Sequence, residues 1–191
     1  YYVAYQLETF PHSGYFSWDD FKKLIENLNW YEVIILAAGI WEDRGNKIDN
    51  YISPILNAPD ITNGVIPYNA LIAAKAVAEM QKTNPDVLKK IFLDLIYSYD
   101  KNFLNSFDLL KNRMDEVIAD LSRISTSLYI DTLANIIEFP NEKDSTRPAT
   151  AIYVLFKQKT ICQPKIAESL VNGLKSHIAS PASMLMAIQL I

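Results

Sequence analysis

The sequence predicts an all-α protein made of antiparallel helix pairs that stack as a right-handed, HEAT-like α-solenoid. Apolar residues recur at the 3.6-residue period of a helix along most of the 191 residues, and short polar connections separate the periodic segments. Paired segments recur with a spacing on the order of 40 residues, without an exact sequence repeat. We therefore expect residues 1–191 to form a single helical-repeat domain, with a closed α-helical bundle as the alternative architecture.

The first helices are indicated by a capping signal and by apolar faces. Ser17 and Asp20 have the spacing of a capping box, and they open a helix whose apolar face runs from Trp18 to Leu28. The β-branched run Val33 to Leu36 is also compatible with a strand, but Ala37-Ala38-Gly39 extends it and no partner strand is evident, so helix is preferred. The helices expected next cover residues 30–41, 46–57 and 68–82.

The later helices follow the same logic. Asn84 and Pro85 are suited to the N-cap and first turn of a helix whose apolar stripe runs from Val87 to Tyr99. The seam from Phe103 to Leu121 alternates spacings of four and three, which predicts a helix of about 20 residues that needs a facing helix to bury it. Ser180-Pro181 repeats the cap-then-proline signal. The remaining helices are expected over 127–139, 146–157, 164–177 and from 181 onward.

The composition excludes several functional classes. The five glycines are scattered, which leaves no phosphate-cradling loop, and the single cysteine, Cys162, excludes an intrachain disulfide framework and a cysteine-based structural zinc site. No apolar stretch is long enough to span a bilayer, and no signal peptide is visible. We expect a cytoplasmic setting. Because the chain begins at Tyr1 rather than Met and stops within an apolar run, we also expect it to be a fragment of a longer protein.

The net charge of −4 gives no overall electrostatic attraction for nucleic acid. The charge is uneven, because residues 141–191 carry six basic and three acidic side chains while residues 1–140 carry a net −7. Solvated lysines on helix faces are the ordinary explanation. The alternative is a local basic patch for an anionic partner, with Lys157, Lys159 and Lys165 as its candidate residues.

Side chains suited to catalysis or metal binding are sparse. His12 is expected in a loop and His177 near a helix end, and neither is close in sequence to Cys162. The acidic segment 42–49 lacks the alternating ligands of an EF-hand and is expected to be a surface turn. We predict no catalytic residue, metal or cofactor. The remaining enzymatic alternative is a site assembled from dispersed acids such as Glu32, Glu79 and Asp94.

Two segments carry recognisable motifs. Residues 30–39 read W-x-E-V-I-x-x-A-A-G, and residues 71–79 read L-x-A-A-x-x-x-A-E. In this order they resemble helices that follow the winged-helix region of NACHT-domain NTPases of the STAND class. Residues 1–7 resemble the end of the helix that closes the preceding region of that family, so residues 1–12 would be its tail. The motif positions that carry the resemblance are Trp30, Val33, Ala37, Gly39, Ala74, Ala78 and Glu79.

The resemblance implies that an ATP- or GTP-hydrolysing NACHT module precedes this chain in a longer protein. The chain would then be its non-catalytic sensor region, which recognises a trigger and controls the NTPase module in signalling or defence. The partners implied are an unidentified trigger and the NTPase module itself, and self-association through exposed terminal helices is a further expectation. The alternative is a generic HEAT-like scaffold for protein–protein interaction, without any NTPase.

Overall fold

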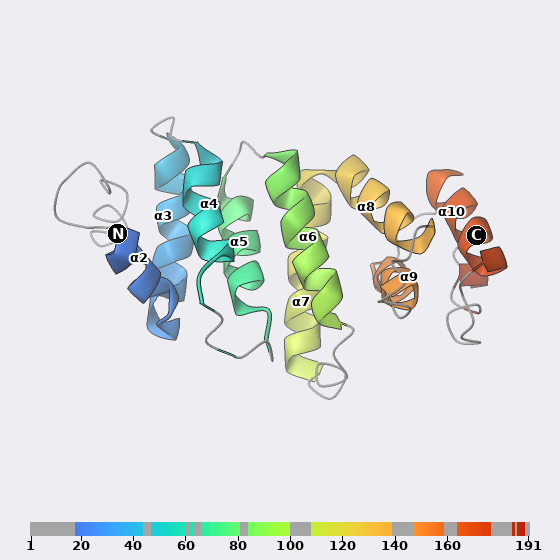
Figure 1. Ribbon diagram of the computed structural model, residues 1–191, viewed down its shortest axis with the longest axis horizontal. Helices are drawn as coiled ribbons and strands as arrows, with labels where there is room; N and C mark the ends of the chain where they lie inside the picture. Colours follow the sequence, from blue (N-terminus) through green and yellow to red (C-terminus); the bar gives the residue numbers. More distant parts are fainter. Residues whose placement is uncertain are drawn as a thin grey trace. The chain divides into compact units, whose positions relative to one another are not determined.

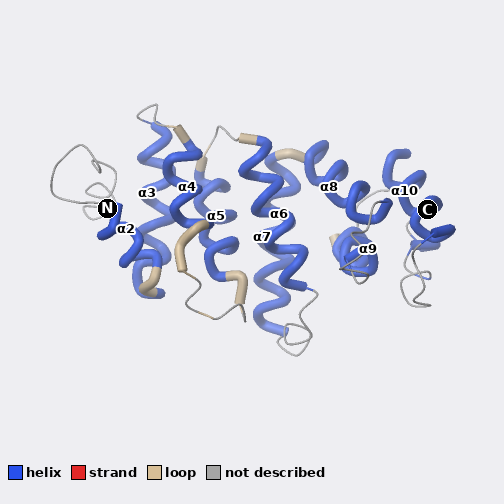
Figure 2. The backbone as a smooth tube through the Cα atoms, viewed as in Figure 1, coloured by secondary structure: helices blue, strands red, loops and turns tan. Residues whose placement is uncertain are grey.

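The computed structural model describes residues 18–43, 47–59, 62, 66–80, 84–99, 108–138, 147–158, 164–176, 185 and 187–189. Within these residues the regular elements are helices and no strand occurs (Figures 1 and 2), which confirms the all-α class. The elements are α2 (Trp18–Ile25), the 3-10 helix η1 (Leu28–Trp30), α3 (Tyr31–Asp43), α4 (Ile48–Leu56), α5 (Tyr68–Glu79), α6 (Pro85–Tyr99), α7 (Asp108–Ile124), α8 (Thr126–Glu138), α9 (Arg147–Lys157) and α10 (Pro164–Ser176).

The chain divides into two compact units, Tyr1–Ile91 and Phe92–Ile191, and the division falls inside α6. Each unit has its own apolar core. In the first unit the core includes Phe21 of α2 together with buried residues of α3, α4 and α5. Helices α3 and α5 are rich in buried alanines, whose small side chains allow close packing of neighbouring helices; they are Ala37, Ala38, Ala70, Ala73, Ala74 and Ala76.

Helices α3 and α5 of the first unit run parallel. Their first residues, Tyr31 and Tyr68, have ring centroids 6.4 Å apart, and near their other ends Gly39 approaches the backbone of Glu79. Helix α4 follows α3 in the chain and runs in the opposite direction to α5. Its end lies beside the start of α5, where the Asn69 side-chain amide donates to the Ala58 carbonyl at 2.8 Å. Figure 1 shows the three helices side by side.

Helix α4 also contacts the start of α6 through polar groups. The Asn84 side-chain nitrogen donates to both carboxylate oxygens of Asp49 at 2.9 Å, and the ammonium of Lys90 donates to the side-chain oxygen of Asn57 at 3.1 Å. Asp49, at the start of α4, thus contacts the residue just before α6, and Asn57, just after the end of α4, contacts Lys90 further along α6. These two helix segments therefore also run parallel.

In the second unit α6 contacts α8 and α8 contacts α10, whereas α9 is seen end-on in Figure 1 and lies across α8. The Phe92 and Tyr129 rings pack with centroids 5.5 Å apart, which joins α6 to α8. Helix α8 contacts α10 through Asp131 and Lys165, 2.7 Å apart. Two turns further along α8, Glu138 accepts hydrogen bonds from Ser169 and Asn172 of α10. Because the later residue of α8 contacts the later residues of α10, the two helices run parallel. The buried apolar residues at the centre of the unit include Leu95, Ile96, Met114, Val117, Leu121, Leu133, Ile137, Ile152, Leu155 and Leu170.

The sequence predicted most helices with small errors at their ends. Helix α5 ends at Glu79 rather than Lys82, because Met80 leaves the helix with φ −91° and ψ 142°. Helix α7 begins at Asp108, and the expected first part of its seam, Phe103 to Phe107, lies outside the described residues. The capping residue Ser17 and the helix start at Ser180-Pro181 also lie outside them.

Only Ser125 separates α7 from α8, in the interval between Leu121 and residue 127 where the sequence predicts the end of one helix and the start of the next. Hydroxyl groups around it bond to backbone carbonyls: Ser122 to Ala119 at 2.8 Å and Thr126 to Ser122 at 3.0 Å. Such bonds compete with the backbone ladder of a helix. They give a physical reason for one long helical pattern to divide here.

Candidate functional site

The residues that carry the family resemblance meet at the α3–α5 contact. Ala37 and Ala74 are buried there, and Gly39 lies against the backbone of Glu79. Trp30 and Val33 are half-buried, and Ala78 and Glu79 are exposed. The tertiary structure thus brings two motifs that lie far apart in the sequence onto neighbouring helices, where the small residues form the contact between backbones.

Glu79 is a motif residue that does not contact the apolar core. Its side chain is exposed, and its part in the contact comes from its backbone carbonyl and β-carbon, which would lie 3.5 and 3.9 Å from a β-carbon at Gly39. Glu32, another candidate acid, is exposed in the first turn of α3. Because α3 and α5 are parallel, Glu32 and Glu79 lie at opposite ends of the pair and do not converge.

An aromatic cluster anchors α4 against α2 and α3. The Tyr51 ring lies 5.2 Å from Phe21 and 5.5 Å from Trp41, measured between ring centroids. The Tyr51 hydroxyl donates to the Ile34 carbonyl at 2.6 Å, and the Trp41 indole N–H donates to the Lys47 carbonyl at 3.1 Å. Burial raises the pKa of the Tyr51 phenol far above its usual range, since the ionised form would lose its hydration.

Tyr31 and Tyr68 form a second aromatic pair, at the amino ends of α3 and α5. Tyr68 is buried, and its hydroxyl has no hydrogen-bond partner within the described part of the chain. Burial, with a smaller effect of the nearby Tyr31 phenol, raises the pKa of Tyr68. The Tyr68 hydroxyl is sealed from solvent, so Tyr68 does not offer a donor to an outside ligand.

Asp49 holds a position that the sequence analysis missed. It lies in the first turn of α4, and its carboxylate accepts both bonds from Asn84, whose side-chain oxygen in turn accepts the Asp86 N–H at 2.9 Å. The predicted capping role of Asn84 is therefore confirmed. The carboxylate lies near the amino ends of two helices, where negative charge is stabilised. In the sequence, Asp49 is visible only as an acid in the first turn of one helix. That signal does not indicate that its carboxylate also contacts the start of α6.

Two of the three candidate lysines, Lys157 and Lys165, lie in the described residues. Lys157 is exposed at the end of α9, and Lys159 lies outside the described residues. Lys165 is exposed in the first turn of α10, but its ammonium pairs with Asp131. The positive charge of Lys165 is thus balanced within the unit.

The structure corrects the expectation for the acidic segment 42–49. Glu42 lies inside α3 and is only 8% exposed, so it is not part of a surface turn. Asp49 belongs to α4. No group of three or more His, Cys, Asp or Glu side chains that could hold a metal ion occurs among the described residues. His12, His177 and Cys162 lie outside them.

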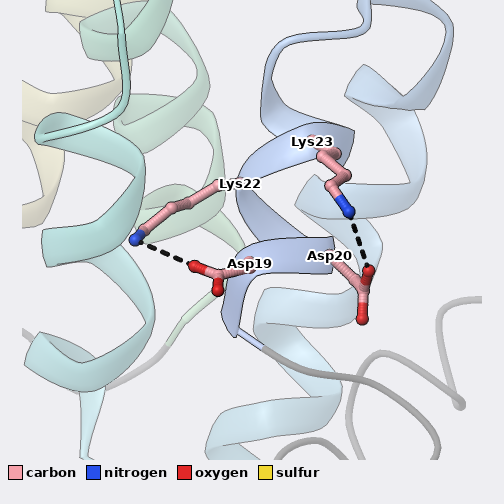
Figure 3. Close-up of polar contacts among 4 residues, drawn as sticks. All are labelled: Asp19, Asp20, Lys22 and Lys23. Atoms are coloured by element: carbon pink, nitrogen blue, oxygen red, sulfur yellow. Dashed lines mark hydrogen bonds and ion pairs between the residues drawn. The ribbon is translucent and has the colours of Figure 1, made fainter.

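The acids at the start of α2 have local partners. Figure 3 shows Asp19 paired with Lys22 at 3.3 Å and Asp20 paired with Lys23 at 3.4 Å. Such exposed pairs contribute little to stability, and they also place negative charge in the first turn, as expected for helix capping. Where the chain is described, none of its helices combines the length and apolar character needed to cross a membrane.

The chain matches no protein-family model, no curated protein and no solved structure.

Proposed function

We propose that the chain is a non-catalytic helical-repeat region, built as a right-handed HEAT-like solenoid, that acts as the sensor and regulatory part of a NACHT-domain NTPase. It would recognise a trigger or partner in the cytoplasm and control the NTPase module in signalling or defence. The proposal is carried by one observation: helices two apart in the chain contact each other repeatedly, at sequence separations between 31 and 40 residues.

The separations support a repeat in each unit. In the first unit, Asp49 and Asn84 are 35 positions apart, and Asn57 and Lys90 are 33 apart. In the second unit, the α8–α10 contacts join residues 34, 31 and 34 positions apart. A longer separation joins α7 to the residue just after α9, because the Gln158 side-chain nitrogen donates to the carbonyl of Asp115, 43 positions earlier.

Separations of 31 to 35 lie close to the period of the shorter two-helix repeats, roughly 33 residues, and the separation of 43 lies within the roughly 40–47 residues of HEAT repeats. In such proteins each repeat buries its apolar face against its neighbours, and the successive helices present an extended surface to a large partner. A bundle of three antiparallel helices also makes its first and third helices parallel, so a single contact of this kind fits both architectures. The repeat architecture is supported by the recurrence of the relation within each of the two units.

The link to an NTPase rests on the resemblance of the α3 and α5 segments, and the packing of these two segments against each other supports it. The decisive experiment uses the longer protein from which we propose this chain comes. Its gene should encode a phosphate-binding loop upstream of Tyr1. Deletion of residues 1–191 should raise basal ATP or GTP hydrolysis, because the sensor would no longer hold the NTPase module inactive.

The alternative function is a HEAT-like protein–protein interaction scaffold. The same repeat separations support it, and it does not need the resemblance to NACHT-domain proteins. An upstream sequence that lacks a phosphate-binding loop would exclude the NTPase proposal and leave the scaffold. If the loop is present but hydrolysis does not change on deletion of residues 1–191, the regulatory part of the proposal is wrong. As a control, Leu36→Asp changes an exposed residue of α3 and should leave folding intact.

A further inference from the structure

The solvent-facing side of α10 has an ordered arrangement of charge. Glu168, Val171 and Lys175 are exposed, and their spacings of three and four residues place them in one stripe on the helix surface. The opposite side of α10 packs on α8 through Ile166, Ser169 and Leu170, which are buried. The stripe is therefore distinct from the surface that holds α10 in its unit.

The two charges of this stripe are unpaired within the described part of the chain. Lys165, in the first turn of the same helix, is different because its ammonium is 2.7 Å from Asp131. Glu168 and Lys175 instead flank Val171, which is 37% exposed. The result is a negative end, an apolar centre and a positive end along about 10 Å of helix, at 1.5 Å per residue.

Such a stripe is complementary to itself. When two copies of a helix pack antiparallel about a two-fold axis, the residues at equal distances on either side of the axis face each other. With the axis between Val171 and Asn172, Glu168 of each copy faces Lys175 of the other, so the dimer contains two such opposite-charge contacts. We propose that the α10 stripe is a self-association surface, occupied by a second copy of this chain in antiparallel orientation.

The neighbouring sequence is suited to the same role. Six large apolar side chains are exposed in the described residues, and four of them fall between residues 156 and 188, namely Phe156, Val171, Leu185 and Ile188. Exposed apolar side chains indicate an interaction surface only where they form one patch, so of these four it is Val171, which lies within the α10 stripe itself, that supports this surface. Because a single helix stripe buries less area than a standard interface, we expect weak association, with a dissociation constant on the order of 100 µM.

The first test is sedimentation equilibrium of the 191-residue chain over a range of concentrations. We expect a monomer–dimer equilibrium whose dissociation constant increases between low and high salt, because exposed ion pairs are screened. A monomer at all concentrations up to about 1 mM would overturn the proposal, since this is well above the expected dissociation constant. Dimerisation that strengthens or does not change with salt would also overturn it.

Charge reversals provide the sharper test. In a dimer of the Glu168→Lys variant, the new lysine of each copy faces Lys175 of the other. In a dimer of the Lys175→Glu variant, the new acid of each copy faces Glu168 of the other. The like charges repel, so each variant should weaken association roughly tenfold or more. An equimolar mixture of the two variants restores both opposite-charge contacts and should associate as the original chain does. The double variant Glu168→Lys/Lys175→Glu should do so as well.

The mixture also controls for folding, since Lys175→Glu places an acid at the carboxyl end of α10, where it is unfavourable. Circular dichroism of each variant should show the helical content of the original chain. Association that is unchanged in both single variants, or that the mixture does not restore, would assign the contact to another surface. Either result is distinguishable from failure of the NTPase proposal, because this inference does not use it.

Discussion

Gly39 of α3 lies so close to the end of α5 that a β-carbon added to it would be 3.5 Å from the carbonyl oxygen of Glu79. This distance is an ordinary van der Waals contact, so the glycine is not required by space. Both residues belong to the motifs that suggested a relationship to NACHT-domain proteins. Their contact shows that the motifs are two sides of one helix pair.

We therefore expect Gly39→Ala to stabilise the first unit by up to about 1 kcal/mol, because alanine has the higher helix propensity and its methyl group fits. Urea denaturation of both forms measures the change. The matched control is Ala78→Gly, at an exposed position of α5, which should cost about 1 kcal/mol. A marked loss of stability in Gly39→Ala would mean that the helices are closer than the structure places them.

The two buried tyrosines of the first unit should respond in opposite directions to loss of the hydroxyl. Tyr51→Phe removes a 2.6 Å hydrogen bond to the Ile34 carbonyl and should destabilise by about 1 kcal/mol. Tyr68→Phe removes a buried hydroxyl that has no partner within the described residues, so it should be neutral or stabilising by up to about 1 kcal/mol. The midpoints of denaturation in urea, compared at equal m-values, measure both changes. Equal losses in the two variants would contradict the hydrogen-bond assignments.

Tyr51 should also make the first unit sensitive to alkali. Its pKa is raised by burial, so the folded state keeps the proton at a pH where the unfolded phenol, with a pKa of about 10, has lost it. Below about pH 10 both states are protonated and the group adds no pH dependence. Above this pH the free energy of unfolding should fall by about 1.4 kcal/mol per pH unit from this group.

Denaturation measured between roughly pH 8 and 11 tests this pH dependence. The slope above pH 10 should be smaller in Tyr51→Phe than in the original chain, because phenylalanine has no proton to lose. Other tyrosines and lysines contribute equally to both proteins and cancel in the difference. Parallel curves for the two proteins would show that Tyr51 ionises with the same pKa in the folded and unfolded states.

The Asp49–Asn84 contact should contribute to the stability of the amino end of α6. Asp49→Ala removes a half-buried carboxylate that accepts two bonds from Asn84, and it should cost about 1–3 kcal/mol. Asn57→Ala, which removes the exposed contact with Lys90, is the matched control and should stay within about 0.5 kcal/mol. A double-mutant cycle between Asp49 and Asn84 measures their coupling, and additive effects would show that the two side chains do not interact.

The helices were predictable from local signals, and the errors lie where the deciding contact is not local. The N-cap at Asn84, the first turn at Pro85 and the apolar stripe of α6 are all encoded within a few residues, and the structure confirms them. The burial of Glu42 was missed because a charged pair next to glycine is typical of a turn. The break at Ser125 falls between the two helices predicted on either side of it, of which the first has its seam up to Leu121 and the second begins at residue 127.

The sequence by itself determined that the described elements are helices, roughly where they begin, and which face of each is apolar, because these properties depend on spacing within one turn or two. Only the tertiary structure decided that α3 lies parallel to α5 and α8 to α10, that Gly39 meets Glu79, and that Asp49 reaches Asn84. These contacts join residues more than 30 positions apart. An apolar face specifies that a helix must be covered, but not which helix covers it, since that choice depends on the shape and small residues of both partners.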